Sequence, residues 1–170
     1  MKSTLILSVL LMTFISSFSQ EIIKEANLSL TLPNDKWKFL KTQEANGLQV
    51  YFYNRESIKD STGRDVIPNI SVVIENVDKK LDVVTYSVMK RSQVKFKVDK
   101  MFLQKDGIIE LKNAVGYKGR YADKFGEHTI YVIHAINKDK GIQVIFDILT
   151  TLFDKLDSEF QVTLKSLKFD

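Results

Sequence analysis

The stretch EHTIYVIHAINKDKGIQVIFDIL, residues 127–149, decides the fold class of this chain. It contains two runs of β-branched and aromatic residues joined by NKDKG, a sequence typical of a hairpin turn. In the first run, apolar residues fill consecutive positions from Ile130 to Ile133, and the second run, from Ile142 to Leu149, is almost as apolar. Both faces of these two strands are therefore apolar. Such strands need cover on both faces, so the sequence predicts a sheet buried between two layers.

Further strands flank this hairpin. Alternation of apolar and polar residues predicts three earlier strands, in NLSLTLP (27–33), LQVYFYN (48–54) and NISVVIENV (69–77). Two more are expected immediately before the hairpin, in IIEL (108–111) and NAVGYKGRYA (113–122), with DKFG (123–126) as the turn. Because the last connections are short hairpin turns, we expect an antiparallel meander.

Two segments have helical spacing instead. In LDVVTYSVMKRSQ, Asp82 is placed to cap backbone N–H groups, which predicts a helix from Asp82 to Ser92. Its expected buried stripe is Leu81, Val84, Thr85, Val88 and Met89. A closing helix is predicted from apolar residues at steps of three and four, namely Phe153, Leu156, Phe160, Leu164 and Leu167.

These elements predict an α+β fold, an antiparallel β-sheet flanked by helices on both faces. The 170 residues, 44% of them hydrophobic, suit one domain with a core of its own, which we place at residues 20–170. The expected core residues are Leu30, Trp37, Val72, Ile74, Val84, Val88, Val132, Val144, Phe146, Phe153, Leu156, Phe160 and Leu164.

Residues 1–19 have the pattern of a secretory signal peptide. Lys2 is the positive start, Leu5 to Ile15 form an apolar run too short to span a bilayer, and Ser17 to Ser19 supply small residues for cleavage. We therefore expect export by the Sec route to the periplasm or the exterior, where the cleaved protein is soluble. The chain has no cysteine, so neither a lipoprotein anchor nor a disulfide is expected.

The charge of the chain is only mildly basic. Lysine and arginine number 25 against 21 acidic residues, a net charge of +4. Nucleic-acid binding usually needs a dense basic patch, so we expect no nucleic-acid partner.

Three aspartates near the end of the chain, Asp147, Asp154 and Asp157, are candidates for paired catalytic carboxylates. A glycosidase pair stands about 5–10 Å apart across a cleft, and nothing in this spacing creates one. Asp154 and Asp157 fall in the first turns of the closing helix, where acids complement the helix dipole. The sequence favours surface acids over catalysis.

Other catalytic or metal-binding patterns are also lacking. His128 and His134 are six residues apart on one strand, so about 20 Å separates them and they cannot share a metal ion. There is no GxSxG motif, and the glycines do not form a phosphate-binding loop. We therefore predict no catalytic, cofactor-binding or metal-binding residue, and no enzymatic activity.

Four stretches in this order resemble the PsbP-like superfamily: LP…W (Leu32, Pro33 and Trp37), PNISV (68–72) leading through LD into a helix, GYKGRY (116–121), and a closing helix ending in SLKF (166–169). The resemblance covers nearly all of the chain after the leader. It implies an antiparallel sheet between helices. Members include a subunit of the photosynthetic oxygen-evolving complex, a Ran-binding nuclear factor, bacterial envelope proteins of the DcrB type and chaperones for secreted effectors.

The resemblance therefore implies a non-catalytic binding or assembly module, and the bacterial type of leader points to the envelope rather than to photosynthesis. The partner is expected to be another protein or an envelope component. Two positive surfaces are candidate contact sites. The first is the 54–68 segment, read as a long mobile loop, with Arg55, Lys59 and Arg64. The second is the basic run KRSQVKFKVDKMFLQK, with Lys90, Arg91, Lys95, Lys97 and Lys100, which alternatively protects an edge strand from aggregation.

A small-ligand carrier is the alternative function, and a hydrolase the third. A carrier would use a pocket of roughly 300 Å³ or more between helix and sheet. The aromatic residues considered for it are Tyr51, Tyr53, Tyr117, Tyr121 and Tyr131.

Overall fold

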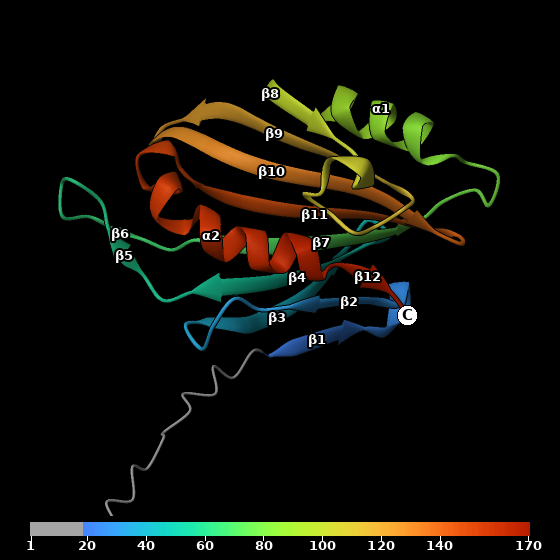
Figure 1. The fold of residues 1–170 in the computed structure, drawn as a ribbon, viewed down its shortest axis with the longest axis horizontal. Helices are drawn as coiled ribbons and strands as arrows, with labels where there is room; N and C mark the ends of the chain where they lie inside the picture. The colour runs from blue at the N-terminus through green and yellow to red at the C-terminus, as the bar shows by residue number, and fades with distance from the viewer. Residues whose placement is uncertain (1–18) are drawn as a thin grey trace, which may run out of the picture.

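The computed structural model describes residues 19–170 (Figure 1). The predicted signal peptide lies outside the described residues, apart from its last residue, Ser19. No helix within the described part of the chain has the length and apolar character needed to cross a membrane.

A seven-stranded antiparallel sheet forms the centre of the molecule, in the order β3-β4-β7-β11-β10-β9-β8. The predicted hairpin is confirmed as β10 and β11, in which Asn137 pairs with Lys140 across a two-residue turn. The strands are β3 (Trp37–Ala45), β4 (Leu48–Arg55), β7 (Asn69–Asn76), β8 (Lys97–Phe102), β9 (Ala114–Asp123), β10 (Gly126–Asn137) and β11 (Lys140–Leu149).

A second, three-stranded sheet closes the end of the core. It consists of β1 (Gln20–Ile23), β2 (Leu28–Thr31) and β12 (Lys168–Phe169), with β2 in the middle. The predicted strand at 27–33 is therefore present, but it does not join the main sheet. Leu28 and Leu30 are fully buried, as the alternation predicts, and so is the polar Ser29. Short 3-10 turns occur at Lys24–Ala26 and Gln104–Asp106.

Two sequence-based expectations about secondary structure are wrong: one segment expected as a loop contains strands, and one expected as a strand does not form one. The 54–68 segment is not an unstructured loop, because β5 (Ile58–Lys59) and β6 (Asp65–Val66) pair in a small hairpin whose Ile58 and Val66 pack against the core. The IIEL segment is not a strand, although its Ile109 and Leu111 are buried. Apolar contacts hold both segments against the core, and a ladder of backbone hydrogen bonds forms only in the first.

The closing helix, α2 (Thr150–Ser166), lies across one face of the seven-stranded sheet (Figure 1). Phe160 is fully buried, with its ring 5.4 Å from that of Phe146 and 5.9 Å from that of Trp37. The helix ends at Ser166, earlier than the sequence predicts. The following Leu167 is buried, and the chain then pairs with β2 as strand β12.

The first helix, α1 (Val83–Gln93), starts as predicted but buries a different face. Asp82 accepts hydrogen bonds from the backbone N–H groups of Val84 and Thr85. The expected buried stripe is wrong, since Val84 and Val88 are 61% and 62% exposed and Met89 is also exposed. Tyr86 and Ser87 are buried instead, because their polar ends find partners on the sheet. The other predicted core residues are all buried.

The two helices contact opposite faces of the main sheet. Tyr131 of β10 packs against Phe153 of α2, whereas His134 of the same strand bonds to Ser87 of α1. Positions 131 and 134 lie on opposite faces because side chains alternate along a strand. The expectation of helices on both faces holds only in part, since α1 packs mainly on β9 and β10, reaches β7 and β11 through Tyr86 and Lys90, and leaves the hollow beside it uncovered.

Candidate binding groove

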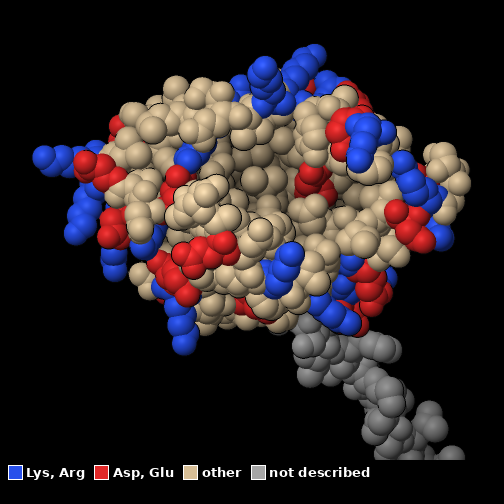
Figure 2. All heavy atoms as spheres, turned by 180° about the vertical axis from the view of Figure 1, so that it is seen from behind, with Lys and Arg blue, Asp and Glu red and all other residues tan. Residues whose placement is uncertain are grey.

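The sheet face opposite α2 is hollowed beside α1, and the hollow is floored mainly by uncharged residues (Figure 2). Its volume is about 230 Å³. The apolar lining residues are Val94, Phe96, Ile130, Val132 and Ile145. The polar lining residues are Lys90, Lys95, Tyr121, His134, Gln143 and Asp147. We call these eleven residues the groove.

One wall of the groove is the segment that joins α1 to β8. This segment can approach the sheet because β9 has a glycine beneath it: a Cβ atom at Gly119 would lie 2.5 Å from the ring of Phe96. Phe96 therefore packs on the β9 backbone, and its ring meets that of Tyr117 edge to face at 6.3 Å. The GYKGRY stretch thus has a structural role, since its second glycine makes room for this wall.

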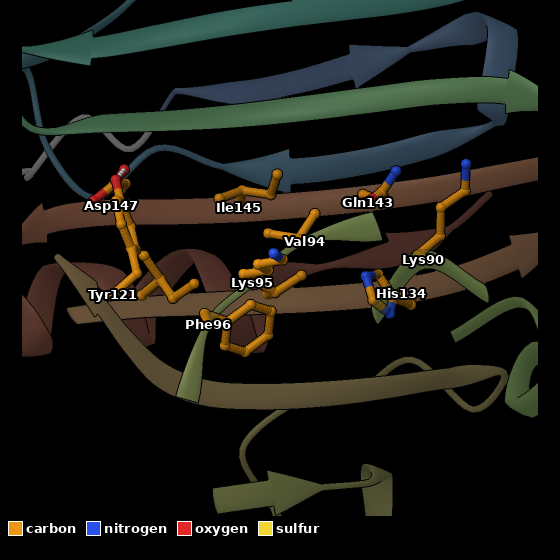
Figure 3. A pocket seen from close by; sticks show the side chains of 11 residues that line it. Lys90, Val94, Lys95, Phe96, Tyr121, His134, Gln143, Ile145 and Asp147 are labelled. Carbon is orange, nitrogen blue, oxygen red and sulfur yellow. Dashed lines mark hydrogen bonds between the residues drawn. The ribbon is translucent and has the colours of Figure 1, made fainter. Parts of the chain in front are cut away.

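His134 forms one end of the groove (Figure 3). Its Nδ1 is 2.9 Å from the hydroxyl of Ser87, which is itself 2.7 Å from the hydroxyl of Tyr117. His134 and Ser87 are 2% and 1% exposed. Burial, together with the charges of Lys90 and Arg91, lowers the pKa of His134 to about 4. The imidazole is therefore neutral at physiological pH, and its Nε2 is the nitrogen left to meet a ligand.

Two cations of α1 stand beside this end. Lys90 forms an ion pair of 2.6 Å with Glu75, the same carboxylate that accepts a hydrogen bond from Tyr86. Arg91 stacks on Phe96, with its guanidinium carbon 4.4 Å from the ring centroid. Lys90 and Arg91 were predicted to contact a partner, but in the structure both attach α1 to the sheet.

Asp147 and Tyr121 form the opposite end of the groove (Figure 3). Tyr121 donates a hydrogen bond of 2.6 Å to Asp147, and the Nδ1 of His128 lies 2.7 Å from the other carboxylate oxygen. Burial and the neighbouring Asp147 raise the pKa of Tyr121 above its ordinary value, so the phenol stays protonated. Asp147 is therefore a structural acid within a hydrogen-bonded cluster, not a solvated surface group as predicted.

The predicted acids do not form a catalytic pair. Asp157 accepts a hydrogen bond from Tyr131, which lies on the α2 side of the sheet, whereas Asp147 faces the groove. Asp154 is exposed on α2. The sheet therefore separates Asp147 from Asp157, and no water or substrate could lie between them as the glycosidase mechanism needs.

His134 lacks the setting of a catalytic base. Ser87 and His134 are at hydrogen-bonding distance, but the hydroxyl is buried, and cations, not a carboxylate, stand near the imidazole. In a nucleophilic triad an acid orients the base. Among residues 19–170, no group of three or more His, Asp or Glu side chains is arranged to hold a metal ion.

None of the three predicted contact residues of the 54–68 segment lines the groove, and their surroundings differ. Arg55 is internal: it holds Glu159 of α2 with bonds of 2.9 and 3.1 Å, and its side chain is only 10% exposed. Lys59 is exposed and pairs with Asp65. Arg64 pairs with Asp60 and donates to the backbone of Phe125, beside a wider hollow of about 490 Å³.

The remaining predicted contact residues, Lys95, Lys97 and Lys100, lie in the groove or on the edge strand next to it. Lys95 lines the groove, while Lys97 and Lys100 are exposed on β8. β8 is an edge strand of the main sheet, which is the position that the alternative interpretation of the basic run, protection from aggregation, requires. The structure thus joins Lys90 and Lys95 in one site and leaves Lys97 and Lys100 on the adjacent edge.

Of the five tyrosines considered for a carrier, only Tyr121 lines the groove. Tyr117 lies under α1, hydrogen-bonded to Ser87. Tyr51, Tyr53 and Tyr131 point to the opposite side of the sheet, where the main core lies. The volume of the groove is also smaller than the 300 Å³ expected for a carrier.

Comparison with solved structures gives one clear result for the whole chain. The solution structure of cyanobacterial PsbP from Synechocystis matches it with a TM-score of 0.56 and 15% identity, covering 96% of this chain and 99% of that one. This chain has a PsbP-like fold. The predicted resemblance is confirmed at the level of the fold, and its four sequence stretches now have places in the structure.

Two other solved structures share the PsbP-like fold. A putative regulator of unknown function from Pseudomonas aeruginosa matches with a TM-score of 0.52 and 9% identity, over 85% of this chain and 91% of that one. A Bacteroides thetaiotaomicron protein matches with a TM-score of 0.50 and 9% identity, over 89% of this chain and 48% of that one. No protein-family model and no curated protein matches the sequence.

The sequence analysis missed the groove as a site, although one signal was available. Once the two-residue turn pairs Asn137 with Lys140, the register places His134 beside Gln143 and Val132 beside Ile145. These four residues share one face, and they supply much of the floor. The wall formed by Val94 and Phe96 had no such signal, because it depends on how α1 docks.

Proposed function

We propose that this protein is an exported, non-catalytic binding module that takes its partner, a protein or another component of the cell envelope, on the groove face of its sheet. The observation that supports this most is the unequal cover of the two faces. One face is sealed by α2 and the three-stranded sheet, whereas the other is covered by α1 at one end and hollowed beside it (Figure 2).

Exposed apolar residues beside the groove support the same face. Val84, Val88 and Met89 lie on the outer surface of α1, and Val94 follows the helix at the rim of the groove, all of them 48–62% exposed. Contiguous exposed apolar surface on a monomer commonly marks an interaction site. The helix and the groove together would therefore present one continuous surface to a partner.

A small-ligand carrier is the second candidate, and one observation favours it. The hollow lies between helix and sheet, has an apolar floor and has polar groups at both ends, which is the general composition of ligand sites. Its volume of about 230 Å³ limits such a ligand to a small one. The leader supports export for either function.

Site-specific photo-crosslinking tests the proposed face. One variant carries a photoreactive phenylalanine analogue at Val94, on the rim of the groove, and a second carries it at Lys155, which is exposed on α2. Both variants are expressed with the leader in bacteria, so that crosslinking takes place in the cell envelope. We expect adducts, identified by mass spectrometry, from position 94 and few from position 155. Adducts that form mainly from position 155 would place the partner on the other face and overturn the proposal.

A further inference from the structure

Hydrogen-bond donors and positive charge concentrate in the half of the groove that runs from Lys95, near its middle, to His134 (Figure 3). Lys95 lines the groove and is exposed, and His134 has only Nε2 left for a ligand because Nδ1 is bonded to Ser87. Lys90 and Arg91 lie close enough to lower the pKa of His134. Glu75 balances one of these three cations, so this end keeps an excess of positive charge.

The opposite end carries the carboxylate of Asp147, and the polar side chains beside it already bond to that carboxylate. Asp147 receives bonds from Tyr121 and His128 on its two oxygens. An anionic group would be repelled there and would find no free donor. Between the two ends lie Ile145 and Val132, with Val94 and Phe96 as the wall (Figure 3). The groove therefore has one end for an anion and an apolar middle.

We propose that the groove binds a small amphiphile with a single carboxylate and an unbranched or aromatic apolar body, the carboxylate lying between Nε2 of His134 and Nζ of Lys95. This proposal goes beyond the proposed partner surface, because it names a small ligand for the groove itself, which lies on the same face. The apolar body lies on Ile145 and Val132 and ends before Asp147.

The size of the groove limits the ligand. At about 30 Å³ for a group the size of a water molecule, 230 Å³ holds about eight such groups. Gln143 and Asp147 are four residues apart on β11, which corresponds to about 13 Å. A chain of about eight carbons matches this volume and is shorter than this length, so octanoate is a suitable probe.

The hydrogen bonds behind His134 suit a carboxylate. Binding through Nε2–H requires that Nδ1 accepts, so that Ser87 donates to Nδ1 and Tyr117 donates to Ser87; the distances of 2.9 and 2.7 Å permit this arrangement. In this arrangement the Ser87 hydroxyl donates one hydrogen bond and accepts one, and the Tyr117 hydroxyl donates. A bound carboxylate therefore selects one tautomer without leaving a buried group unpaired.

The test is a titration of the isotope-labelled domain, residues 20–170, followed by NMR and calorimetry, with four eight-carbon probes: octanoate, 1-octanol, octylamine and octanedioate. We expect saturable binding of octanoate with shifts centred on His134, Gln143 and Ile145. 1-Octanol should bind more weakly, and octylamine and octanedioate least, since both bring a charge that one end repels. Equal binding of octanoate and 1-octanol would overturn the proposal.

Matched lysine variants test the position of the carboxylate. Lys95→Ala should weaken octanoate binding about five- to tenfold, as expected for loss of one charge-assisted hydrogen bond at a partly exposed site, and should leave 1-octanol unchanged. Lys100→Ala removes an exposed lysine outside the groove and should change neither. An unchanged affinity in Lys95→Ala would overturn the assignment.

Different results would overturn the proposed partner face and the proposed carboxylate site. If octanoate does not bind while position 94 forms partner adducts, the carboxylate assignment is overturned and the binding face stands. If octanoate binds at the groove while adducts form from position 155 alone, the ligand site stands and the proposed partner face is overturned.

Discussion

Ser87 of α1 and His134 of β10 share a hydrogen bond of 2.9 Å between the hydroxyl and Nδ1. This bond, buried between helix and sheet, fixes α1 over one end of the groove and determines which ring nitrogen faces it. Because polar side chains of α1 face the sheet, its apolar residues lie on the opposite, solvent-exposed side of the helix. The exposure of Val84 and Val88 and the position of the groove therefore have the same origin.

The buried His134 should make folding stability depend on pH. Its pKa is lowered to about 4 in the folded state from 6.5, so the unfolded chain binds the proton more tightly. The stability is therefore complete above pH 6.5 and declines as the pH falls toward 4. Between about pH 7.5 and pH 5, the wild type should lose about 2 kcal/mol more than His134→Leu. Denaturant unfolding at both pH values measures this, and parallel profiles would contradict it.

The internal ion pair of Arg55 should contribute to stability. Arg55→Ala leaves Glu159 largely buried with only Trp37 as a hydrogen-bond donor, so the free energy of unfolding should fall by about 2–3 kcal/mol. The surface pair of Lys59 with Asp65 serves as control, and Lys59→Ala should cost about 1 kcal/mol or less. Equal costs for the two variants would contradict this assignment.

The same ion pair predicts a response to acid. Burial alone would raise the pKa of Glu159, but hydrogen bonds from Arg55 and Trp37 and the charge of Arg55 hold it below the ordinary 4.5. Its contribution is therefore complete above about pH 4.5 and lost as the pH falls through the lower folded-state pKa. Glu159→Gln should show less acid destabilisation than the wild type in urea unfolding at pH 5 and pH 3.

Two phenylalanines at contrasting positions test the core. Phe160→Ala should cost about 3–5 kcal/mol, because its ring is fully buried among Trp37, Phe146 and Phe153. Phe125→Ala, at a position that is 55% exposed, should change stability by about 0.5 kcal/mol or less. Thermal unfolding of both variants distinguishes them, and similar melting temperatures would mean that Phe160 is not packed as described.

The basic residues near the groove should influence the rate of binding more than the fold. Reversing Lys95, Lys97 and Lys100 to Glu should slow association with an acidic partner and weaken its salt dependence, with little loss of folding stability. All three residues are exposed, so their replacement removes no core contact. Stopped-flow association at two salt concentrations measures this once a partner is identified, and an unchanged rate would exclude the lysines from steering.

The sequence alone determined the elements whose packing depends on their own periodicity. Local patterns of apolar and polar residues predict the hairpin of β10 and β11, the buried face of α2 and the cap at Asp82. These patterns can be recognised without knowledge of the tertiary contacts. The sequence also contained the register of the groove floor, because a two-residue turn after Asn137 specifies every pair along the hairpin.

Only the tertiary structure decided what depends on contacts between distant segments. The apolar stripe of α1 predicted the wrong buried face, because hydrogen bonds and an ion pair to the sheet compensate the burial of Tyr86, Ser87 and Lys90. Likewise, Arg55 became internal because Glu159, 104 residues away, meets it across the core. Periodicity indicates how apolar each face of a helix or strand is. The hydrogen-bond or ion-pair partner of a buried polar side chain depends instead on how whole helices and strands pack together.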